Sequence, residues 1–320
     1  MFTRARRTLK RTLGLDTLHN RIETLHNQMD NLKMLSSKIL IEQMNGCGAY
    51  NSIHRVEFKV FSQFGDDGII QYLIHNAEVD VEKFVEFGVE DYSESNTRFL
   101  LMNNNWQGFV MDASSEHIQH IKRQEYYWKY DLTAVQCWID RENINGVIRD
   151  NGFSGLLGLL SIDVDGNDYW IWESLDTVEP VITIVEYNSV FGDKHAITIP
   201  YDPGFNRTKA HYSNLYWGTS LRALCMLAEK KGYVFVGCNS SGNNAYFVKQ
   251  DKIGRIRPCT VQEGYVESRF RESRDTDGCL TFVARGERLK LIEDMPVYDL
   301  EKKRLAKIKD LDGLDIAEAQ

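Results

Sequence analysis

Short apolar runs alternate with amphipathic segments along residues 55–250. The runs have the length of strands, and those at residues 155–162 and 180–185 are apolar almost throughout, as in strands buried on both faces of a parallel sheet. The segments between the runs carry apolar residues at helical spacing. The predicted strands are residues 83–88, 108–111, 133–139, 155–162, 180–185, 233–237 and 245–248. The predicted helices are residues 69–76, 98–105, 114–124, 142–151 and 221–231.

The order of these elements predicts the fold class. Strands that alternate with helices form a parallel sheet whose two faces are covered by the helices. Only residues 239–244 separate the last two strands, and their Asn, Ser and Gly content is typical of a hairpin turn. The sequence therefore predicts a Rossmann-like, doubly wound α/β fold with a mostly parallel, seven-stranded sheet and an antiparallel last strand.

Residues 15–39 form a different pattern. Apolar residues recur there at alternating spacings of three and four, which is a heptad seam, and the predicted element is a helix. The seam fits either a short coiled coil that joins copies of the chain or a helix that packs on the main domain. Its members are Leu15, Leu18, Ile22, Leu25, Met29, Leu32 and Ile39.

The ends of the chain are more charged than its middle. The first eleven residues contain five Arg or Lys residues and no acid, so this segment is either a solvated helix end or a peripheral contact with an anionic membrane surface. We expect three parts: a basic helical arm over residues 1–48, an α/β domain over residues 49–255, and a charged extension over residues 256–320 with a terminal helix near residues 300–309.

Composition excludes several classes of protein. The net charge of −8 disfavours nucleic acid as a partner of the whole chain. No run of about 18 apolar residues is present, so no segment is expected to span a membrane. The six cysteines are scattered without a C-x-x-C pair, which favours reduced thiols and a cytoplasmic protein.

Residues 83–112 predict a binding site for a nucleoside. A strand ends in Glu86-Phe87-Gly88, a polar turn and a helix follow, and the next strand ends in Asp112, 24 residues after Gly88. Glycine lets backbone approach a ligand closely, and a carboxylate at a strand end can accept hydrogen bonds from ribose hydroxyls. A nucleotide-like cofactor is therefore the first hypothesis.

Acidic residues also end the later strands. Asp163 follows the strand at residues 155–162, and Glu186 follows the strand at residues 180–185. Because ligands bind outside the carboxyl ends of parallel strands, these acids should converge on one cleft with Glu86 and Asp112. Asp163, Asp165, Glu186 and Asn188 could hold Mg²⁺, Mn²⁺ or Ca²⁺, whereas the alternative is that Asp163 caps a helix and Asp165 is a turn residue.

These residues resemble a family. Glu86-Phe87-Gly88, Asp112 and the closing hairpin resemble class I S-adenosylmethionine-dependent methyltransferases over residues 60–250. Four further segments resemble the FkbM-like branch: residues 62–68, Asn96-Thr97, residues 142–145 and residues 161–166. One departure is Tyr92, which stands where the family's turn often carries a second glycine.

The resemblance implies S-adenosyl-L-methionine as the cofactor and a sugar hydroxyl of a glycan or glycosylated metabolite as the acceptor. It implies that Glu86 belongs to the cofactor site, that Gly88 faces the methionine portion of the cofactor and that Asp112 faces the ribose. Ile139 and Asp140 are expected beside the adenine, and Gln63 is expected at the methionine end.

Proton removal from the acceptor hydroxyl needs a base. The candidates are Asp163 and two histidines, His195 and His211, in the loop between Glu186 and the helix at residues 221–231. Aromatic side chains in and before this loop could stack on sugar faces or belong to the core: Tyr169, Trp170, Trp172, Tyr187, Tyr201, Tyr212, Tyr216 and Trp217.

The resemblance therefore implies an S-adenosylmethionine-dependent O-methyltransferase as the leading hypothesis, and whether a divalent metal assists it stays open. Two alternatives stay open. One is a non-catalytic scaffold, in which the α/β domain only binds the cofactor and the heptad arm makes oligomers. The other is an NAD-dependent enzyme, which the lack of a G-x-G-x-x-G segment around Gly88 disfavours.

Overall fold

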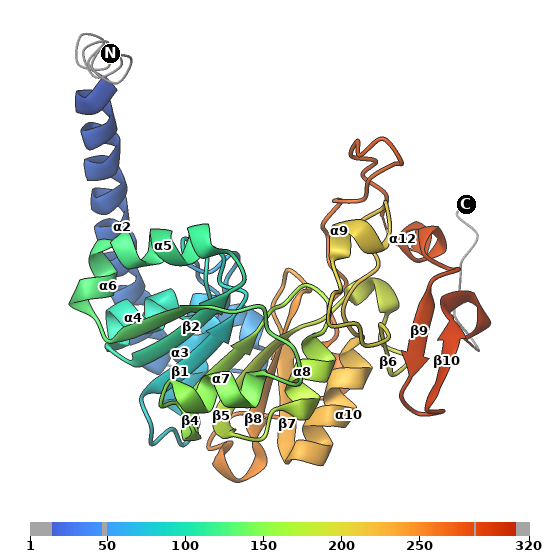
Figure 1. Cartoon of the computed structure of the whole chain (residues 1–320). Helices are drawn as coiled ribbons and strands as arrows, with labels where there is room; N and C mark the ends of the chain where they lie inside the picture. Colours follow the sequence, from blue (N-terminus) through green and yellow to red (C-terminus); the bar gives the residue numbers. More distant parts are fainter. Residues whose placement is uncertain (1–14, 47–49, 285, 312–320) are drawn as a thin grey trace. The chain divides into compact units, whose positions relative to one another are not determined.

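The computed structural model describes residues 15–46, 50–284 and 286–311. Its main feature is a seven-stranded sheet with the strand order β3-β2-β1-β4-β5-β8-β7 (Figure 1). β8 runs antiparallel to both of its neighbours, and the pairs among the first five strands are parallel. The predicted fold class is confirmed. The strands are β1 (Lys83–Phe87), β2 (Gln107–Asp112), β3 (Leu132–Gln136), β4 (Gly155–Ile162), β5 (Val178–Glu186), β7 (Tyr233–Cys238) and β8 (Asn244–Lys249).

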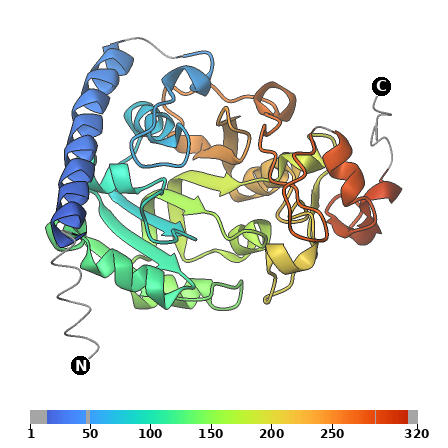
Figure 2. The same ribbon diagram turned by 90° about the horizontal axis from the view of Figure 1, so that it is seen from above.

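Helices lie on both sides of this sheet (Figure 2). Their ends follow the local sequence: Ser114 caps one helix by accepting a hydrogen bond from the backbone of His117, and Ser220 caps another through Ala223. Gly232 ends that second helix with φ +81°, as a helix-terminating glycine should. The helices are α3 (Asp66–Asn76), α4 (Arg98–Asn104), α5 (Ser115–Arg123), α6 (Glu125–Lys129), α7 (Ile144–Asp150), α8 (Asp168–Ser174) and α10 (Leu221–Lys231).

The strand order creates a switch point between β1 and β4. From β1 the chain moves outward through β2 to β3, and it then returns to the other side of β1 as β4. The loops after β1 and β4 therefore leave the sheet in opposite directions, which opens a crevice at the carboxyl ends of these strands. Apolar side chains under the crevice, including those of Phe87, Leu160 and Ile162, are buried.

The C-terminal extension differs from the prediction. The helix predicted over residues 300–309 is wrong. These residues form a turn, the strand β10 (Arg304–Lys307) and the first part of a short 3-10 helix (Ile308–Asp310). β10 pairs with β9 (Pro296–Asp299), and β9 pairs with β6 (Ile197–Thr198) from the connection between β5 and α10. The extension is thus part of the same compact unit as the main sheet. Its other helices are α11 (Val261–Gly264) and α12 (Gly286–Leu291), and α9 (Arg207–Ala210) lies in the connection after β6.

The N-terminal part is a separate unit that contains the helix α2 (Leu15–Gly46). The helix predicted over residues 15–39 is confirmed and continues for seven residues beyond it, from residue 40 to Gly46. The basic segment over residues 1–11 lies outside the described residues, so its predicted membrane contact stays a prediction. In the described part of the chain, no helix combines the length and the hydrophobicity that a bilayer crossing requires.

Candidate functional site

A large cavity lies at the carboxyl ends of β1, β2, β4 and β5. Its volume is about 950 Å³, at the upper end of the range for small-molecule sites. The four strand-end acids, Glu86, Asp112, Asp163 and Glu186, all line it, as the sequence predicts. The cavity therefore coincides with the place where an open α/β sheet binds its ligands.

Glu86 has a role that the sequence did not indicate. Its buried carboxylate accepts hydrogen bonds from the backbone N–H groups of Asn96 and Thr97 and from the hydroxyl groups of Ser95 and Thr97. Burial raises the pKa of Glu86, although these hydrogen bonds oppose the shift. The carboxylate therefore holds the loop that leads into α4, and its predicted contact with a cofactor stays a prediction.

Tyr92 belongs to this same support. Its backbone is in the left-handed region with φ +64°, and its side chain is fully buried. The hydroxyl group lies 2.9 Å from the hydroxyl of Thr97, and the ring packs edge-on against Tyr126 at 5.7 Å. Tyr92 does not line the cavity. Because the ring points into the protein, its bulk does not reduce the room for a ligand.

Gly88 is required by the protein itself. Its φ is +69°, and a Cβ atom at this position would lie 1.6 Å from the carbonyl oxygen of Asp163. At this position the backbone of the loop after β1 therefore lies directly against the backbone of the loop after β4. Gly88 still lines the cavity, so its predicted closeness to a ligand is compatible with the structure.

Both carboxylate oxygens of Asp112 have hydrogen-bond partners in the protein. One oxygen, Oδ2, accepts a 2.9 Å hydrogen bond from the backbone of Glu90. The other, Oδ1, accepts from the backbone of Ser114 at 2.7 Å and lies 3.0 Å from Nδ1 of His117. Since a carboxylate oxygen can accept two hydrogen bonds, Oδ2 can still bind a ribose hydroxyl. His117 also lines the cavity, and no sequence pattern distinguishes it from the other seven histidines.

The two residues expected beside the adenine separate in the structure. Ile139 lines the cavity, but Asp140 does not. The Asp140 carboxylate accepts hydrogen bonds from the backbone of Glu142 at 3.0 Å and Asn143 at 2.8 Å, and so orders the turn before α7. Trp138, next to Ile139, lines the cavity and donates its indole N–H to the carbonyl of Pro203.

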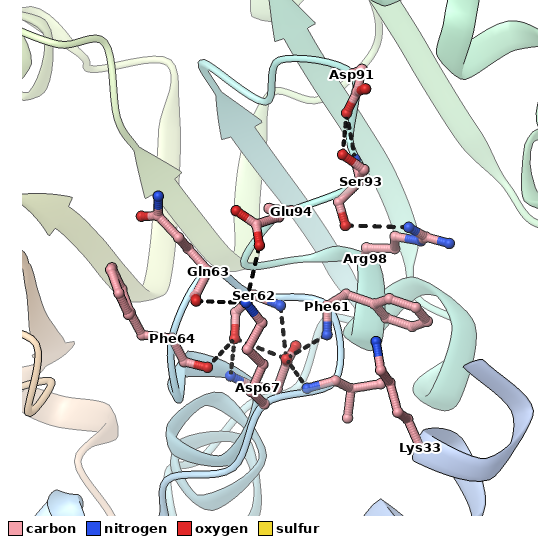
Figure 3. Close-up of polar contacts among 12 residues, drawn as sticks. Lys33, Phe61, Ser62, Gln63, Phe64, Asp67, Asp91, Ser93, Glu94 and Arg98 are labelled. Atoms are coloured by element: carbon pink, nitrogen blue, oxygen red, sulfur yellow. Dashed lines mark hydrogen bonds and ion pairs between the residues drawn. The ribbon is translucent and has the colours of Figure 1, made fainter. Parts of the chain in front are cut away.

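The loop before α3 presents Gln63 to the cavity. One buried carboxylate oxygen, Oδ2 of Asp67, accepts hydrogen bonds from the backbone of Val60, Phe61 and Ser62 at 2.7 to 2.8 Å. Figure 3 shows these bonds and the Gln63 side chain pointing away from Asp67. The Asp67 carboxylate thus shapes the loop, which leaves the Gln63 side chain available to a ligand.

This carboxylate makes the stability of the protein depend on pH. Burial raises the pKa of Asp67 to about 6, whereas the unfolded chain ionises near 3.9. As the pH rises from 4 to 7 the unfolded state loses its proton first, so over this range the group destabilises the folded state by about 2 kcal/mol. Relative to the Asp67→Asn variant, which lacks the ionisation, the wild type should lose about this much unfolding free energy in urea titrations over that pH range. A pH-independent difference would contradict the assignment.

Three carboxylates meet at the carboxyl ends of β4 and β5. Asp163, Asp165 and Glu186 each place one oxygen within 4.8 Å of the other two. Burial, and then the charge of Asp165, raises the pKa of Asp163, while burial and the charge of Asp163 raise that of Glu186. Oε2 of Glu186 is buried without a hydrogen-bond partner among the described residues. The cluster therefore brings three carboxylates together and contains a buried acceptor that nothing in the described chain satisfies.

Two polar residues near the cluster already form hydrogen bonds with the backbone. Asn188, predicted as a metal ligand, donates to the carbonyls of Leu215 and Trp217, and its oxygen accepts from the backbone of Val190. It therefore holds the loop after β5. Asp168 accepts from the backbone of Val164 and Gly166, so it closes the turn after β4.

Arg207 is the main feature that the sequence did not indicate. It lines the cavity, and it pairs with Asp165 at 3.1 Å and with Glu272 from the C-terminal extension. Its guanidinium carbon lies 4.5 Å from the ring centre of Trp217. Asp165 is 42 residues from Arg207 and Glu272 is 65 residues from it, so no local pattern reveals the contact.

Neither predicted histidine base reaches the cavity. His211 lies 2.8 Å from the hydroxyl of Ser213, and burial lowers its pKa. His195 is also absent from the lining residues. Both predictions are therefore wrong for the described structure, and Asp163 is the predicted base that the cavity retains.

The aromatic prediction holds only in part. Of the eight aromatic residues named from the sequence, Tyr187 and Trp217 line the cavity. Tyr169 and Trp172 are core residues. Other aromatic side chains supply the cavity wall from the loop before α3, the segment before α9 and the C-terminal extension: Phe64, Phe205 and Phe270.

No protein-family model matches the sequence, and no curated protein matches it. The chain is similar to solved structures that include methyltransferases and a domain with SAH bound. The N-terminal domain of EvdMO1 with SAH bound is 11% identical at a TM-score of 0.37, over 62% of this chain and 83% of that chain. The O-methyltransferase from Bacillus cereus in complex with SAH is 13% identical at a TM-score of 0.37, over 65% and 89%. A methyltransferase from Clostridium acetobutylicum is 10% identical at a TM-score of 0.36, over 59% and 90%.

Proposed function

We propose that this protein is an S-adenosylmethionine-dependent O-methyltransferase of the FkbM-like branch that methylates a sugar hydroxyl. The observation that carries the proposal is the position of the cavity. It lies at the switch point between β1 and β4, where a doubly wound sheet binds nucleotide-like ligands, and Asp112 stands at the end of β2 with acceptor capacity left for a ribose. The antiparallel strand β8, which forms a hairpin with β7, agrees with the antiparallel last strand expected from the sequence.

The residues present fit the cofactor. Asp112 would accept hydrogen bonds from the ribose, and Trp138 and Ile139 offer apolar surface to an adenine ring. Gln63 offers an amide to the polar methionine end. When bound, S-adenosylmethionine supplies an electrophilic methyl group, so the protein has only to orient an acceptor and remove its proton.

The carboxylate cluster would carry out the second task. The raised pKa values of Asp163 and Glu186 make these groups better proton acceptors than ordinary carboxylates. Trp217 and Phe270 offer aromatic surface to a sugar, and Asn206 offers a side chain amide. This combination of flat apolar faces and polar groups supports a sugar acceptor.

The cluster also fits a divalent metal ion. Three carboxylates with one unsatisfied buried oxygen are the hard ligands that Mg²⁺ or Mn²⁺ prefers, and they lie close enough to share one ion. A bound metal would lower the pKa of an acceptor hydroxyl. Asp163, Asp165 and Glu186 would hold it, and solvent would replace the ligand predicted from Asn188.

Calorimetry with S-adenosylhomocysteine tests the cofactor site. The Asp112→Asn variant should bind the ligand about 10–100-fold more weakly, because it loses a charged acceptor for ribose hydroxyls. Asp140→Asn is the matched control, since it removes a carboxylate that orders the turn before α7 but does not line the cavity. Equal affinity in wild type and Asp112→Asn would remove Asp112 from the cofactor site, and no binding by the wild type would reject the proposal.

A further inference from the structure

The helix α2 leaves its heptad seam in contact with solvent. At one set of seam positions, Leu18, Leu25 and Leu32 are 54%, 57% and 64% exposed. At the alternating set, Ile22 and Met29 are 42% and 56% exposed. Monomeric proteins rarely expose a continuous apolar stripe of this kind, so the stripe indicates an interaction surface.

The narrowness of the stripe indicates what kind of partner covers it. Between residues 16 and 31, every residue outside the seam is polar or charged. A helix that packs on a globular core usually carries a wider stripe of three or four apolar residues in every seven, whereas two in seven is the pattern of a coiled-coil seam. The partner is therefore another helix with the same repeat, and a second copy of this chain provides one.

The seam also favours one arrangement of the two copies. Ile22, a β-branched residue, lies at an a position, and Leu occupies the next d positions at residues 25 and 32, a combination that favours two parallel strands. Further along, Leu35 and Leu40 lie at g and e positions and are 61% and 42% exposed. In a parallel, in-register pair the g residue of one helix meets the e residue five positions later in its partner. Leu35 would then contact the partner's Leu40, so the same register covers both.

We propose that the protein is a homodimer held by a parallel, in-register, two-stranded coiled coil of α2. Leucine and isoleucine side chains from residues 18 to 40 form its apolar seam, with Met29 at the centre. The proposal is independent of methyl transfer, since it depends only on the seam of α2.

Light scattering on the full-length protein at tens of micromolar tests the dimer. Wild type should have twice the mass of one chain, and Leu25→Lys, which places two charges in the seam, should have the mass of one chain. Asn27→Lys adds the same charge on the opposite, polar face and should stay a dimer. A monomeric wild type, a larger oligomer, or a Leu25→Lys variant that is still dimeric would overturn the proposal. Far-UV circular dichroism and thermal unfolding of each variant show whether its fold is intact.

A cysteine placed in the seam tests the orientation. Ser36 occupies an a position, so in a parallel, in-register pair two copies of Ser36→Cys face each other and should form a disulfide under mild oxidation. Asn27→Cys, at the outer f position, should add no cross-link above the background of the native cysteines. Equal cross-linking of both variants, or none from Ser36→Cys in a dimeric sample, would contradict the parallel arrangement.

Discussion

Replacing Asp163 with asparagine should lower kcat for methyl transfer by about 10²–10⁴-fold, the usual contribution of a general base. The carboxylate lies in the cavity wall, within 4.8 Å of Asp165 and Glu186 oxygens, and its raised pKa makes it a strong proton acceptor for a carboxylate. Asparagine has nearly the same shape but cannot accept the proton, and it is a poorer metal ligand. Binding of S-adenosylhomocysteine should be retained, because Asp112 is the proposed partner of the ribose.

Two comparisons make this result specific. Asp140→Asn should keep the wild-type kcat, since its carboxylate does not line the cavity. Chelation by EDTA separates the two ways in which Asp163 can act. If the cluster holds a metal, EDTA should abolish wild-type turnover and Mg²⁺ or Mn²⁺ should restore it; if Asp163 accepts the proton directly, EDTA should have no effect. A kcat for Asp163→Asn within a few-fold of wild type would exclude Asp163 from both roles.

The fold was predictable because local patterns in this chain agree with the tertiary structure. β4 covers Gly155–Ile162, and α10 covers Leu221–Lys231, each with the predicted bounds. In the first case the apolar run has the length of a strand, and in the second a serine cap and a terminal glycine mark both ends. The parallel pairing of the first five strands then follows from their alternation with helices. The short strands of the extension, each of four residues, carry no such pattern, so residues 300–309 were predicted as a helix.

The site was predictable only as far as strand ends determine it. Parallel strands bring Asp112, Asp163 and Glu186 to one edge of the sheet, and the sequence shows where each strand ends. It does not show which donors surround a carboxylate. Glu86 lines the cavity as predicted, but its carboxylate accepts hydrogen bonds from the loop before α4. Asp140 does not line the cavity, and its carboxylate accepts hydrogen bonds from the turn before α7.

Long loops limit the prediction further. The path of the connection between β5 and α10 decides that Arg207 enters the cavity and that His195 and His211 do not. Its course depends on contacts with distant segments, such as the pairing of β6 with β9 and of Arg207 with Glu272. No spacing of residues within the loop encodes these contacts. Residue type alone therefore favours His195 and His211 as bases, because histidine is the most common general base.

Replacing Gly88 with alanine should destabilise the folded state by about 3–5 kcal/mol, the sum of a left-handed backbone penalty and a close backbone contact. The added Cβ atom would lie 1.6 Å from the carbonyl oxygen of Asp163, and a backbone atom cannot move aside as a flexible side chain could. The loop after β1 is also tied to β2, because the N–H of Gly88 donates to the carbonyl of Met111 at 3.0 Å. Relief of the contact must therefore displace Asp163, so methyl transfer should fall together with stability.

Gly152→Ala is the matched control for this contact. Gly152 has a similar φ of +80°, but beyond its chain neighbours no atom lies within 4 Å of the position that an added Cβ atom would take. The variant should therefore show only the backbone penalty of about 1–2 kcal/mol and keep its activity. Urea denaturation of the two variants gives the difference, which measures the contact between the loops after β1 and β4. If the free energy of unfolding falls by the same amount in both variants, the two loops can move apart without an energetic cost. In that case Gly88 does not fix the position of Asp163.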